Sequence, residues 1–137
     1  MKLPPNIIDA NVILRFFLGD DKKQLLKARA FFQKTEFDQE ETLLTEIVFA
    51  EVIWVLQKVY SIPRKEITEK FSRLLAYKGI KTILNKEIFL ESLRQYPLHV
   101  IDIQDIFLAV LSKKNNSTVI TFDKTDFKKL DAIFSEP

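Results

Sequence analysis

The order of apolar segments along the chain most constrains its fold. Short apolar runs, each followed by a longer stretch of helical periodicity, recur along all 137 residues, and no linker, repeat or low-complexity segment interrupts them. Strands separated by helical crossovers are typical of an α/β domain with a parallel sheet, because antiparallel hairpins need much shorter connections. The sequence therefore predicts one domain, residues 1–137.

Five strands and seven helices are expected from this pattern. The predicted strands are 7–8, 43–44, 80–84, 98–101 and 118–122. The predicted helices are 11–18, one starting after Asp21, 46–59, one opened by Pro63 and ended by Gly79, 86–95, 102–114 and a short helix within 124–134. Asn11, Asp21 and Thr45 are the expected N-caps, and Gly19 ends the first helix.

Composition excludes several classes of function. Apolar residues make up 47% and charged residues 29% of the chain, as in ordinary soluble proteins, and twelve Phe residues favour a Phe-rich core. The absence of cysteine excludes disulfides and thiolate chemistry. No apolar run is long enough for a signal peptide or a membrane span, so we expect a cytoplasmic protein without membrane contact. The net charge of +2 only weakly permits a polyanionic partner.

Acidic residues follow three of the predicted strands. Asp9 comes directly after the first strand, Asp102 and Asp105 after the fourth, and Asp123 after the fifth. Ligands of open α/β sheets bind at the carboxyl ends of the strands, so these carboxylates are expected to meet at one edge. Asp102 is equally well explained as a helix N-cap, and Asp9 and Asp123 taken singly as turn or cap residues.

Glu51 is the fourth candidate. It stands among apolar neighbours, with Ile47, Val48, Trp54 and Val55 at the positions three and four residues away. A helix that is apolar on all sides is expected to be buried, and a buried carboxylate is costly unless a cation meets it. Since no Lys or Arg is available locally, the expected partner is a distant basic residue or a metal ion.

Clustered carboxylates favour hard divalent cations such as Mg²⁺ or Mn²⁺, which prefer oxygen ligands. Such an ion can hold a phosphate and activate a water molecule. The single histidine, His99, cannot supply an acid–base pair, and neither a Gly-rich phosphate loop nor a Ser-His-Asp set is present. Metal-assisted hydrolysis of phosphodiesters is the chemistry that remains.

Four segments in order resemble those of the PIN-domain ribonucleases, especially the VapC-like toxins of type II toxin–antitoxin pairs. The segments are 7–15, with Asp9-Ala10-Asn11; 45–52, which includes Glu51; 102–109, whose second aspartate is Asp105; and 121–127, with Thr121-Phe122-Asp123. Each segment alone is a weak signal, but four in the expected order over nearly the whole chain form a specific one.

This resemblance implies a three-layer α/β/α PIN-like domain with a five-stranded parallel sheet in the order 3-2-1-4-5. It also implies metal-dependent cleavage of RNA, a homodimer and inhibition by a small antitoxin protein. Asp9 and Asp105 would be the principal ligands of Mg²⁺ or Mn²⁺, completed by Glu51 and Asp123. Asn11 and Thr121 would be supporting hydrogen-bonding residues, and Asp126 ranks below Asp123 as a spare acid.

Two other functions remain open. The chain could be a catalytically inactive PIN-fold module that binds RNA or protein in an RNA-processing complex, although a degenerate site usually lacks at least one acid. A phosphotransfer receiver domain is disfavoured, because the Asp20-Asp21 pair follows a helix rather than a strand. Lysines near the last two motifs are candidates for contacts with an RNA backbone, or for a solvated face: Lys113, Lys114, Lys124, Lys128 and Lys129.

Overall fold

The structure, a computed structural model, describes residues 2–137 as two compact units. The first unit ends at Lys86, and the second runs from Glu87 to Pro137. Both units combine helices with short parallel strands, which confirms the α/β class expected from the sequence. A single domain over residues 1–137 stays a prediction.

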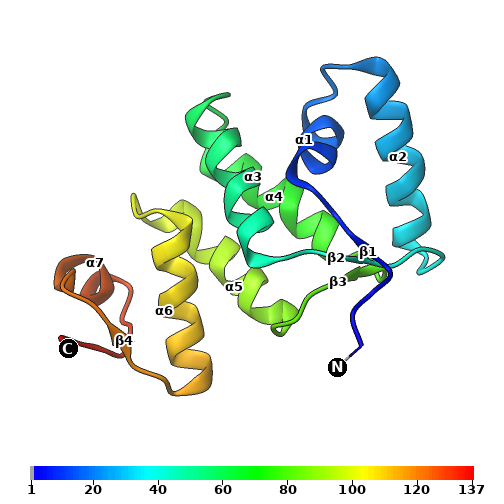
Figure 1. Cartoon of the computed structure of the whole chain (residues 1–137). Coiled ribbons are helices and arrows are strands. Elements are labelled where there is room, and N and C mark those ends of the chain that lie inside the picture. The colour runs from blue at the N-terminus through cyan, green and yellow to red at the C-terminus, as the bar shows by residue number, and fades with distance from the viewer. Residues whose placement is uncertain (1) are drawn as a thin grey trace. The chain divides into compact units, whose positions relative to one another are not determined.

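The first unit is built around a three-stranded sheet. Its elements are β1 (Asn6–Ile7), α1 (Ala10–Leu18), α2 (Lys22–Glu36), β2 (Thr42–Leu43), α3 (Glu46–Lys58), α4 (Arg64–Leu75) and β3 (Ile80–Lys81). The strands are parallel in the order β1-β2-β3, with Asn6 opposite Thr42 and Thr42 opposite Ile80. Helix α1 packs against α2 and α3, and α3 packs against α4 (Figure 1).

Aromatic rings fill the core of this unit, as the phenylalanine content predicts. Phe32, Phe49 and Phe71 are almost completely buried. The ring centroids of Phe49 and Phe71 are 4.9 Å apart in an edge-to-face arrangement, and those of Phe16 and Phe32 are 4.6 Å apart. Such ring pairs are typical of stable aromatic packing, so α1, α2, α3 and α4 are held by shared side chains.

The helix starts agree in part with the predictions. Asp21 accepts a hydrogen bond from the Gln24 backbone N at 3.0 Å, and Thr45 accepts one from Val48 at 3.2 Å, so both are confirmed as N-caps. The prediction for α1 was wrong, because Asp9 rather than Asn11 occupies the N-cap position, without a side-chain cap hydrogen bond. Gly19 ends α1 with a left-handed φ of 63°, a conformation that glycine adopts at low cost.

Backbone hydrogen bonds of Gly79 connect the end of α2 with strand β2. Its N–H donates to the Thr35 carbonyl at 2.7 Å, and its own carbonyl accepts from the Thr42 N–H at 2.9 Å. A Cβ atom here would lie 2.8 Å from the Thr35 carbonyl oxygen and closer still to that of Glu40. The expectation that Gly79 ends a helix was wrong, since α4 ends at Leu75; close backbone approach requires glycine instead.

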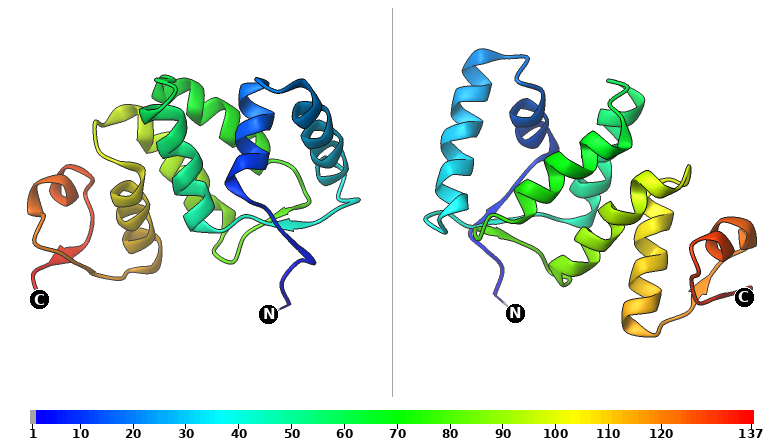
Figure 2. Two further views of the ribbon diagram at one scale, coloured as in Figure 1. Left: turned by 45° about the horizontal axis from the view of Figure 1, so that its top comes forward. Right: turned by 180° about the vertical axis from the view of Figure 1, so that it is seen from behind.

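The second unit contains three α-helices and a two-stranded sheet. Its elements are α5 (Lys86–Gln95), the 3₁₀-helix η1 (Tyr96–Leu98), α6 (Ile103–Asn115), β4 (Val119–Ile120), α7 (Lys124–Lys129) and β5 (Phe134–Ser135). Strands β4 and β5 are parallel, with Val119 opposite Phe134. Figure 2 shows α7 as the crossover between these strands, and α7 also packs against α6.

Two predictions for this unit were wrong. The expected strand at 98–101 is absent: Tyr96–Leu98 forms η1, and Val100 is 94% exposed. Pro97 lies at the start of η1, where its fixed φ suits a tight helical turn and its missing N–H leaves no bond unmade. The short helix expected within 124–134 is confirmed as α7, and the chain then forms β5, which was not predicted. The five parallel strands therefore form two sheets, rather than one sheet in the order 3-2-1-4-5.

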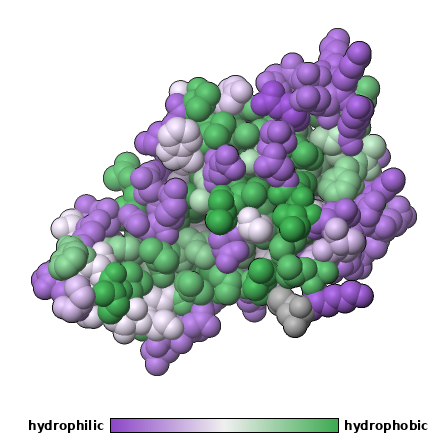
Figure 3. Space-filling model, in the orientation of Figure 1, coloured by the Kyte–Doolittle hydropathy of each residue, from purple (hydrophilic) through white to green (hydrophobic). Residues whose placement is uncertain are grey.

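Apolar side chains also reach the surface. Figure 3 shows green apolar patches among purple polar ones on one face of the molecule, and the exposed apolar residues of the first unit include Ile7, Ile47 and Trp54. None of the helices within residues 2–137 is both long enough and apolar enough to cross a membrane.

Candidate functional site

Three aspartates come together in the second unit. Asp105, Asp123 and Asp126 each offer a carboxylate oxygen, and these oxygens all lie within 4.8 Å of one another. Asp105 and Asp126 are half-buried, whereas Asp123 is exposed. The structure thus brings Asp105 and Asp123 together as predicted, and it adds Asp126, which the sequence ranked only as a reserve.

Each of these aspartates lies at the start of a helix. Asp105 lies in the first turn of α6, three residues after Asp102, which occupies the N-cap position without a side-chain cap hydrogen bond. Asp123 caps α7, because its Oδ1 accepts from the Asp126 N–H at 3.2 Å. The Thr121 hydroxyl oxygen accepts from the Asp123 N–H at 2.9 Å. Thr121 therefore orders the loop that carries Asp123.

The cluster carries unrelieved negative charge. Burial raises the pKa of Asp105 above its usual value, and the nearby carboxylates of Asp123, Asp126 and Asp102 raise it further. Among the residues the structure describes, no ion pair involves Asp105, Asp123 or Asp126. Ionised Asp105 is thus disfavoured in the folded chain unless a cation joins the cluster.

The raised pKa of Asp105 predicts a pH-dependent effect on stability. A raised folded-state pKa contributes stability that is fully present below the unfolded value and is lost as the pH rises through the folded value. Ionised Asp105 therefore destabilises the metal-free protein at neutral pH. We expect Asp105→Asn to raise the free energy of unfolding in urea at pH 7, and the gain to shrink toward about pH 3.9, the usual aspartate pKa.

The control for this measurement is Asp131→Asn. Asp131 is exposed, belongs to the same unit and lies outside the cluster, and its positive φ of 55° suits asparagine equally well. A gain of the same size in this variant, or no gain in Asp105→Asn, would contradict the electrostatic explanation.

The donor chemistry of the cluster fits a divalent metal ion. All three side chains offer hard oxygen donors, and a small, closely spaced anionic set is what Mg²⁺ and Mn²⁺ prefer. The half-buried position of Asp105 strengthens the attraction to a cation, since charges interact more strongly away from water. The site residues thus suit a divalent ion that prefers oxygen ligands.

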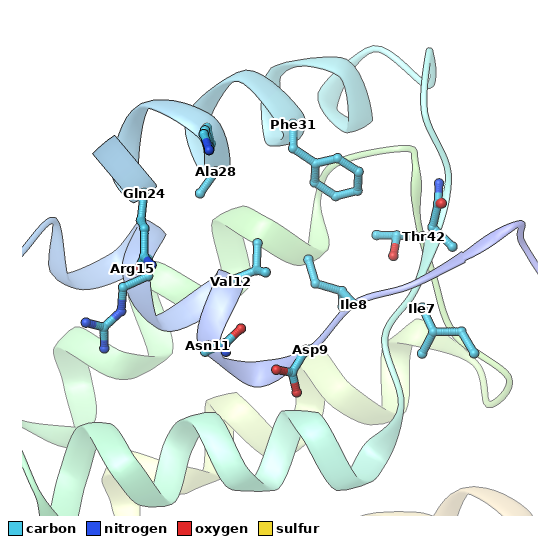
Figure 4. Close-up of a pocket in the computed structure, with 12 residues that line it drawn as sticks. Ile7, Ile8, Asp9, Asn11, Val12, Arg15, Gln24, Ala28, Phe31 and Thr42 are labelled. Carbon is cyan, nitrogen blue, oxygen red and sulfur yellow. The ribbon is translucent and has the colours of Figure 1, made fainter. Parts of the chain in front are cut away.

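The other predicted ligands, Asp9 and Glu51, belong to the first unit. Asp9 is exposed at the start of α1 and lines a cavity together with Asn11 (Figure 4). No hydrogen bond of the Asn11 side chain is found within the described residues.

Glu51 does not have the predicted environment. Its side chain is exposed, on the same face of α3 as Ile47 and Trp54, which are 81% and 49% exposed. The opposite face, with Phe49, Val52 and Ile53, is buried. The sequence showed that α3 is apolar on all sides, but not that one apolar face is exposed. Glu51 is therefore not desolvated, and the prediction of a buried carboxylate was wrong; its role as a ligand stays a prediction.

Two of the candidate RNA-binding lysines have local partners. Lys113 donates to the Leu130 carbonyl at 3.3 Å, and Lys124 pairs with Glu136 at 3.1 Å. All five lysines are exposed, which suits either a solvated face or contacts with phosphates.

Comparison with known proteins identifies the family. No curated protein matches the chain. The model of the PIN domain family matches residues 7–133, nearly the whole length, and the match includes Asp9, Glu51 and all three clustered aspartates. PIN domains are generally metal-dependent nucleases, in agreement with the carboxylate cluster. The chain therefore belongs to the PIN domain family.

Proposed function

We propose that the protein is a metal-dependent endoribonuclease that hydrolyses phosphodiester bonds of RNA. The observation that carries this proposal is the cluster of Asp105, Asp123 and Asp126, whose oxygens lie within 4.8 Å of one another. Membership of a family of nucleases supports the same reaction class. The resemblance of the four sequence segments to PIN-domain ribonucleases supports RNA as the substrate.

In this proposal the aspartates hold Mg²⁺ or Mn²⁺. When bound, the ion would polarise a phosphate and lower the pKa of a water molecule. Asp105 supplies the carboxylate that gains most from a cation, because its own ionisation is disfavoured without one. Thr121 holds the loop of Asp123 through the backbone, so that this carboxylate keeps its position.

The proposal includes Asp9 and Glu51 of the first unit as further metal ligands. Their support is the resemblance of their segments to the family and their place within the matched residues 7–133. Asn11 is proposed as a supporting residue on the same grounds.

Metal dependence is the first test. We expect purified protein to cut a circular single-stranded RNA, which only an endonuclease can open, with Mg²⁺ or Mn²⁺ present. Excess chelator is expected to lower the rate more than about a hundredfold, since even loss of residues around a metal site costs 10–100-fold. Readdition of Mn²⁺ should restore cleavage. Cleavage that persists in chelator would contradict a metal-dependent reaction.

The second candidate, an inactive module that binds RNA or protein, predicts a different result. Titration of Mn²⁺ into the metal-free protein by calorimetry separates the two. Saturable binding that disappears in Asp105→Asn supports a metal centre, whereas no binding favours the inactive module.

We also propose that this nuclease is a cytoplasmic toxin that forms a homodimer and is inhibited by a small antitoxin protein. The support is the resemblance of its four segments to VapC-like toxins. Light scattering on the purified protein tests the dimer, and growth arrest on expression, relieved by the product of an adjacent small reading frame, tests the toxin.

A further inference from the structure

A pocket at β3 concentrates positive charge in the first unit. It measures about 370 Å³ and is lined by Lys78 and by the continuous run 80–86. These residues belong to β3 and to the segments directly before and after it. Pockets for small ligands usually enclose about 300–1,000 Å³. The pocket, called the lysine pocket below, is thus large enough for a phosphate group and part of the molecule that carries it.

Three lysines supply the charge of the lysine pocket. Lys78, Lys81 and Lys86 all line it, and the segment 78–86 contains no Asp or Glu. The net charge of the whole chain is only +2, so this short segment is more positive than the chain as a whole. In the described part of the chain, the only ion pair of these lysines joins the Nζ of Lys81 to Asp38 at 3.8 Å. Two of the three ammonium groups thus lack an acidic partner there.

The ammonium group of Lys86 is half-buried and held in place. Its Nζ donates to the Tyr77 carbonyl at 3.0 Å. Burial lowers the pKa of Lys86, the charge of Lys81 lowers it further, and Asp38 offsets only part of this effect. An ammonium group carries three N–H donors, so Lys86 keeps two for another acceptor. An anion in the lysine pocket would therefore relieve the repulsion between the two lysines.

This arrangement differs from that of a merely solvated face. Lysines of a solvated face extend into water, where the charge stays hydrated and the side chain keeps its rotamer freedom. Lys86 has given up part of both, and Lys81 is oriented by Asp38. Ammonium groups that are fixed before a ligand arrives lose less entropy when they bind it. The lysine pocket is thus partly organised for an anion.

A chain of phosphates fits this pocket. Lysine binds phosphate as a point charge, so three lysines can meet phosphate groups without exact geometry. The Thr82 hydroxyl already donates to the Leu84 carbonyl, which leaves the ammonium groups to supply the charge. Ile83, which is 48% exposed, adds apolar surface that suits a sugar or base beside the phosphates. RNA combines these features, and it is the polyanion that the proposed function already requires.

We propose that the lysine pocket binds the phosphate backbone of the RNA substrate through Lys78, Lys81 and Lys86. The inference rests on the proposed function and deepens it, because it assigns a substrate contact to residues outside the proposed metal ligands. Phosphate contacts position a strand but carry no sequence information. The lysine pocket is therefore expected to bind RNAs of different sequence alike.

The first test measures binding of the whole chain to a labelled single-stranded RNA by fluorescence anisotropy in EDTA, where metal-dependent cleavage cannot occur. Lys78→Gln, Lys81→Gln and Lys86→Gln are each expected to weaken binding about three- to tenfold, as for a charge-assisted contact that is partly exposed. Each should also reduce the slope of log binding constant against log salt by about 0.7, the value per phosphate of a single strand. Replacement by arginine, which keeps the charge, should retain most of the binding.

The matched control is Lys65→Gln, which removes the same charge from an exposed lysine of α4 that does not line the pocket. It is expected to leave RNA binding nearly unchanged. Lys86→Gln also alters the bond to Tyr77, so its melting temperature is measured as well. In the described part of the chain Lys78 makes no such bond, so Lys78→Gln gives the decision if Lys86→Gln proves less stable.

A second test locates the site and separates the sources of the anion. Amide chemical shifts are followed during titration with a short RNA oligonucleotide, with inorganic phosphate and with a glutamate peptide of equal charge, again in EDTA. We expect the RNA to shift residues 78–86 and to bind more tightly than phosphate, because its phosphates are linked. Equal affinity for inorganic phosphate would indicate a site for a free anion, and equal affinity for the peptide would indicate an acidic protein. Either result overturns the inference.

The outcomes also separate this inference from the proposed function. RNA binding that Lys78→Gln and Lys81→Gln weaken, and that Lys65→Gln and Asp105→Asn do not, supports the lysine pocket whether or not RNA is cleaved. Equal RNA binding by the pocket variants and by the control overturns the inference, even if metal-dependent cleavage is found. An RNA titration that leaves residues 78–86 unshifted overturns it as well.

Discussion

Asp105→Asn is expected to lower the rate of RNA cleavage by more than about a hundredfold, since removal of a residue around a metal site already costs 10–100-fold. Asparagine has nearly the same shape but carries no charge and offers one neutral oxygen in place of a carboxylate. Asp105 is one of the two half-buried members of the cluster, and burial, together with the nearby carboxylates, raises its pKa. Its charge is therefore the one that a bound cation most relieves. Initial rates on a labelled single-stranded RNA, at fixed Mn²⁺, measure the effect.

The control for this comparison is again Asp131→Asn, which removes one negative charge from the same unit outside the cluster. It is expected to cleave RNA at nearly the unchanged rate. Because Asp105→Asn should also be more stable at neutral pH, lost activity cannot be ascribed to unfolding. Cleavage by Asp105→Asn at the rate of the control would contradict the assignment of the cluster as the active site.

The same comparison ranks the remaining acids. Glu51→Gln can be paired with Glu46→Gln, which removes an acid five residues earlier on the same helix. The cleavage rates of Asp123→Asn and Asp126→Asn can be compared in the same way. Asp123 was predicted as a ligand, whereas Asp126 ranked below it and was added to the cluster by the structure. A larger loss in Asp126→Asn than in Asp123→Asn would reverse the ranking made from the sequence.

Gly79→Ala is expected to lower the free energy of unfolding of the first unit by about 3 kcal/mol, the upper end of the usual cost of overpacking. The added Cβ would meet the backbone carbonyl oxygens of Glu40 and Thr35, which cannot rotate away as a side chain could. Relief of this clash requires movement of the segment between α2 and β2. The hydrogen bonds of Gly79 to Thr35 and Thr42 would be strained as a result. Urea denaturation followed by circular dichroism measures the loss.

Gly19 provides the contrast. It has a positive φ of 63°, and a Cβ there would make only an ordinary contact of 3.5 Å with Leu25. Gly19→Ala should therefore cost about 1–2 kcal/mol, the usual penalty of a left-handed conformation, and Gly19→Asn less. If Gly79→Ala were no more destabilising than Gly19→Ala, the close approach at Gly79 would not be a constraint on folding.

The sequence predicted the first unit more accurately than the second. Periodicity and caps located α2 and α3, since Asp21 and Thr45 combine a capping side chain with a following apolar stripe. The three strands of the first unit were placed within three residues. The prediction of a strand at 98–101 failed because apolar composition does not show whether a neighbouring strand exists. Val100 is in fact exposed. Strand β5 was not predicted, because Phe134 fell within the segment in which a short helix was expected.

The candidate site was predictable where it depended on chain order alone. Asp123 follows strand β4, as the rule for strand ends predicts. Asp105 joins it from the first turn of α6, although the strand expected before that helix is absent. Asp126 was undervalued although it stands three residues after a helix cap, a spacing that places both residues on the same first turn. Glu51 shows the opposite error, because hydrophobic neighbours in sequence were taken for burial in space. Exposure depends on which face of α3 has a packing partner, and a single sequence does not specify that.

The carboxylate of Asp123 has two roles. Its Oδ1 caps the N-terminus of α7, and the same group is part of the aspartate cluster. Helix α7 has six residues, too few to be stable by its own hydrogen bonds. The order of the last segment of the chain and the occupancy of the cluster are thus linked quantities. An ion bound at Asp123 would stabilise α7 against unfolding. Unfolding of α7 would weaken ion binding by the same free energy by which the bound ion stabilises the helix.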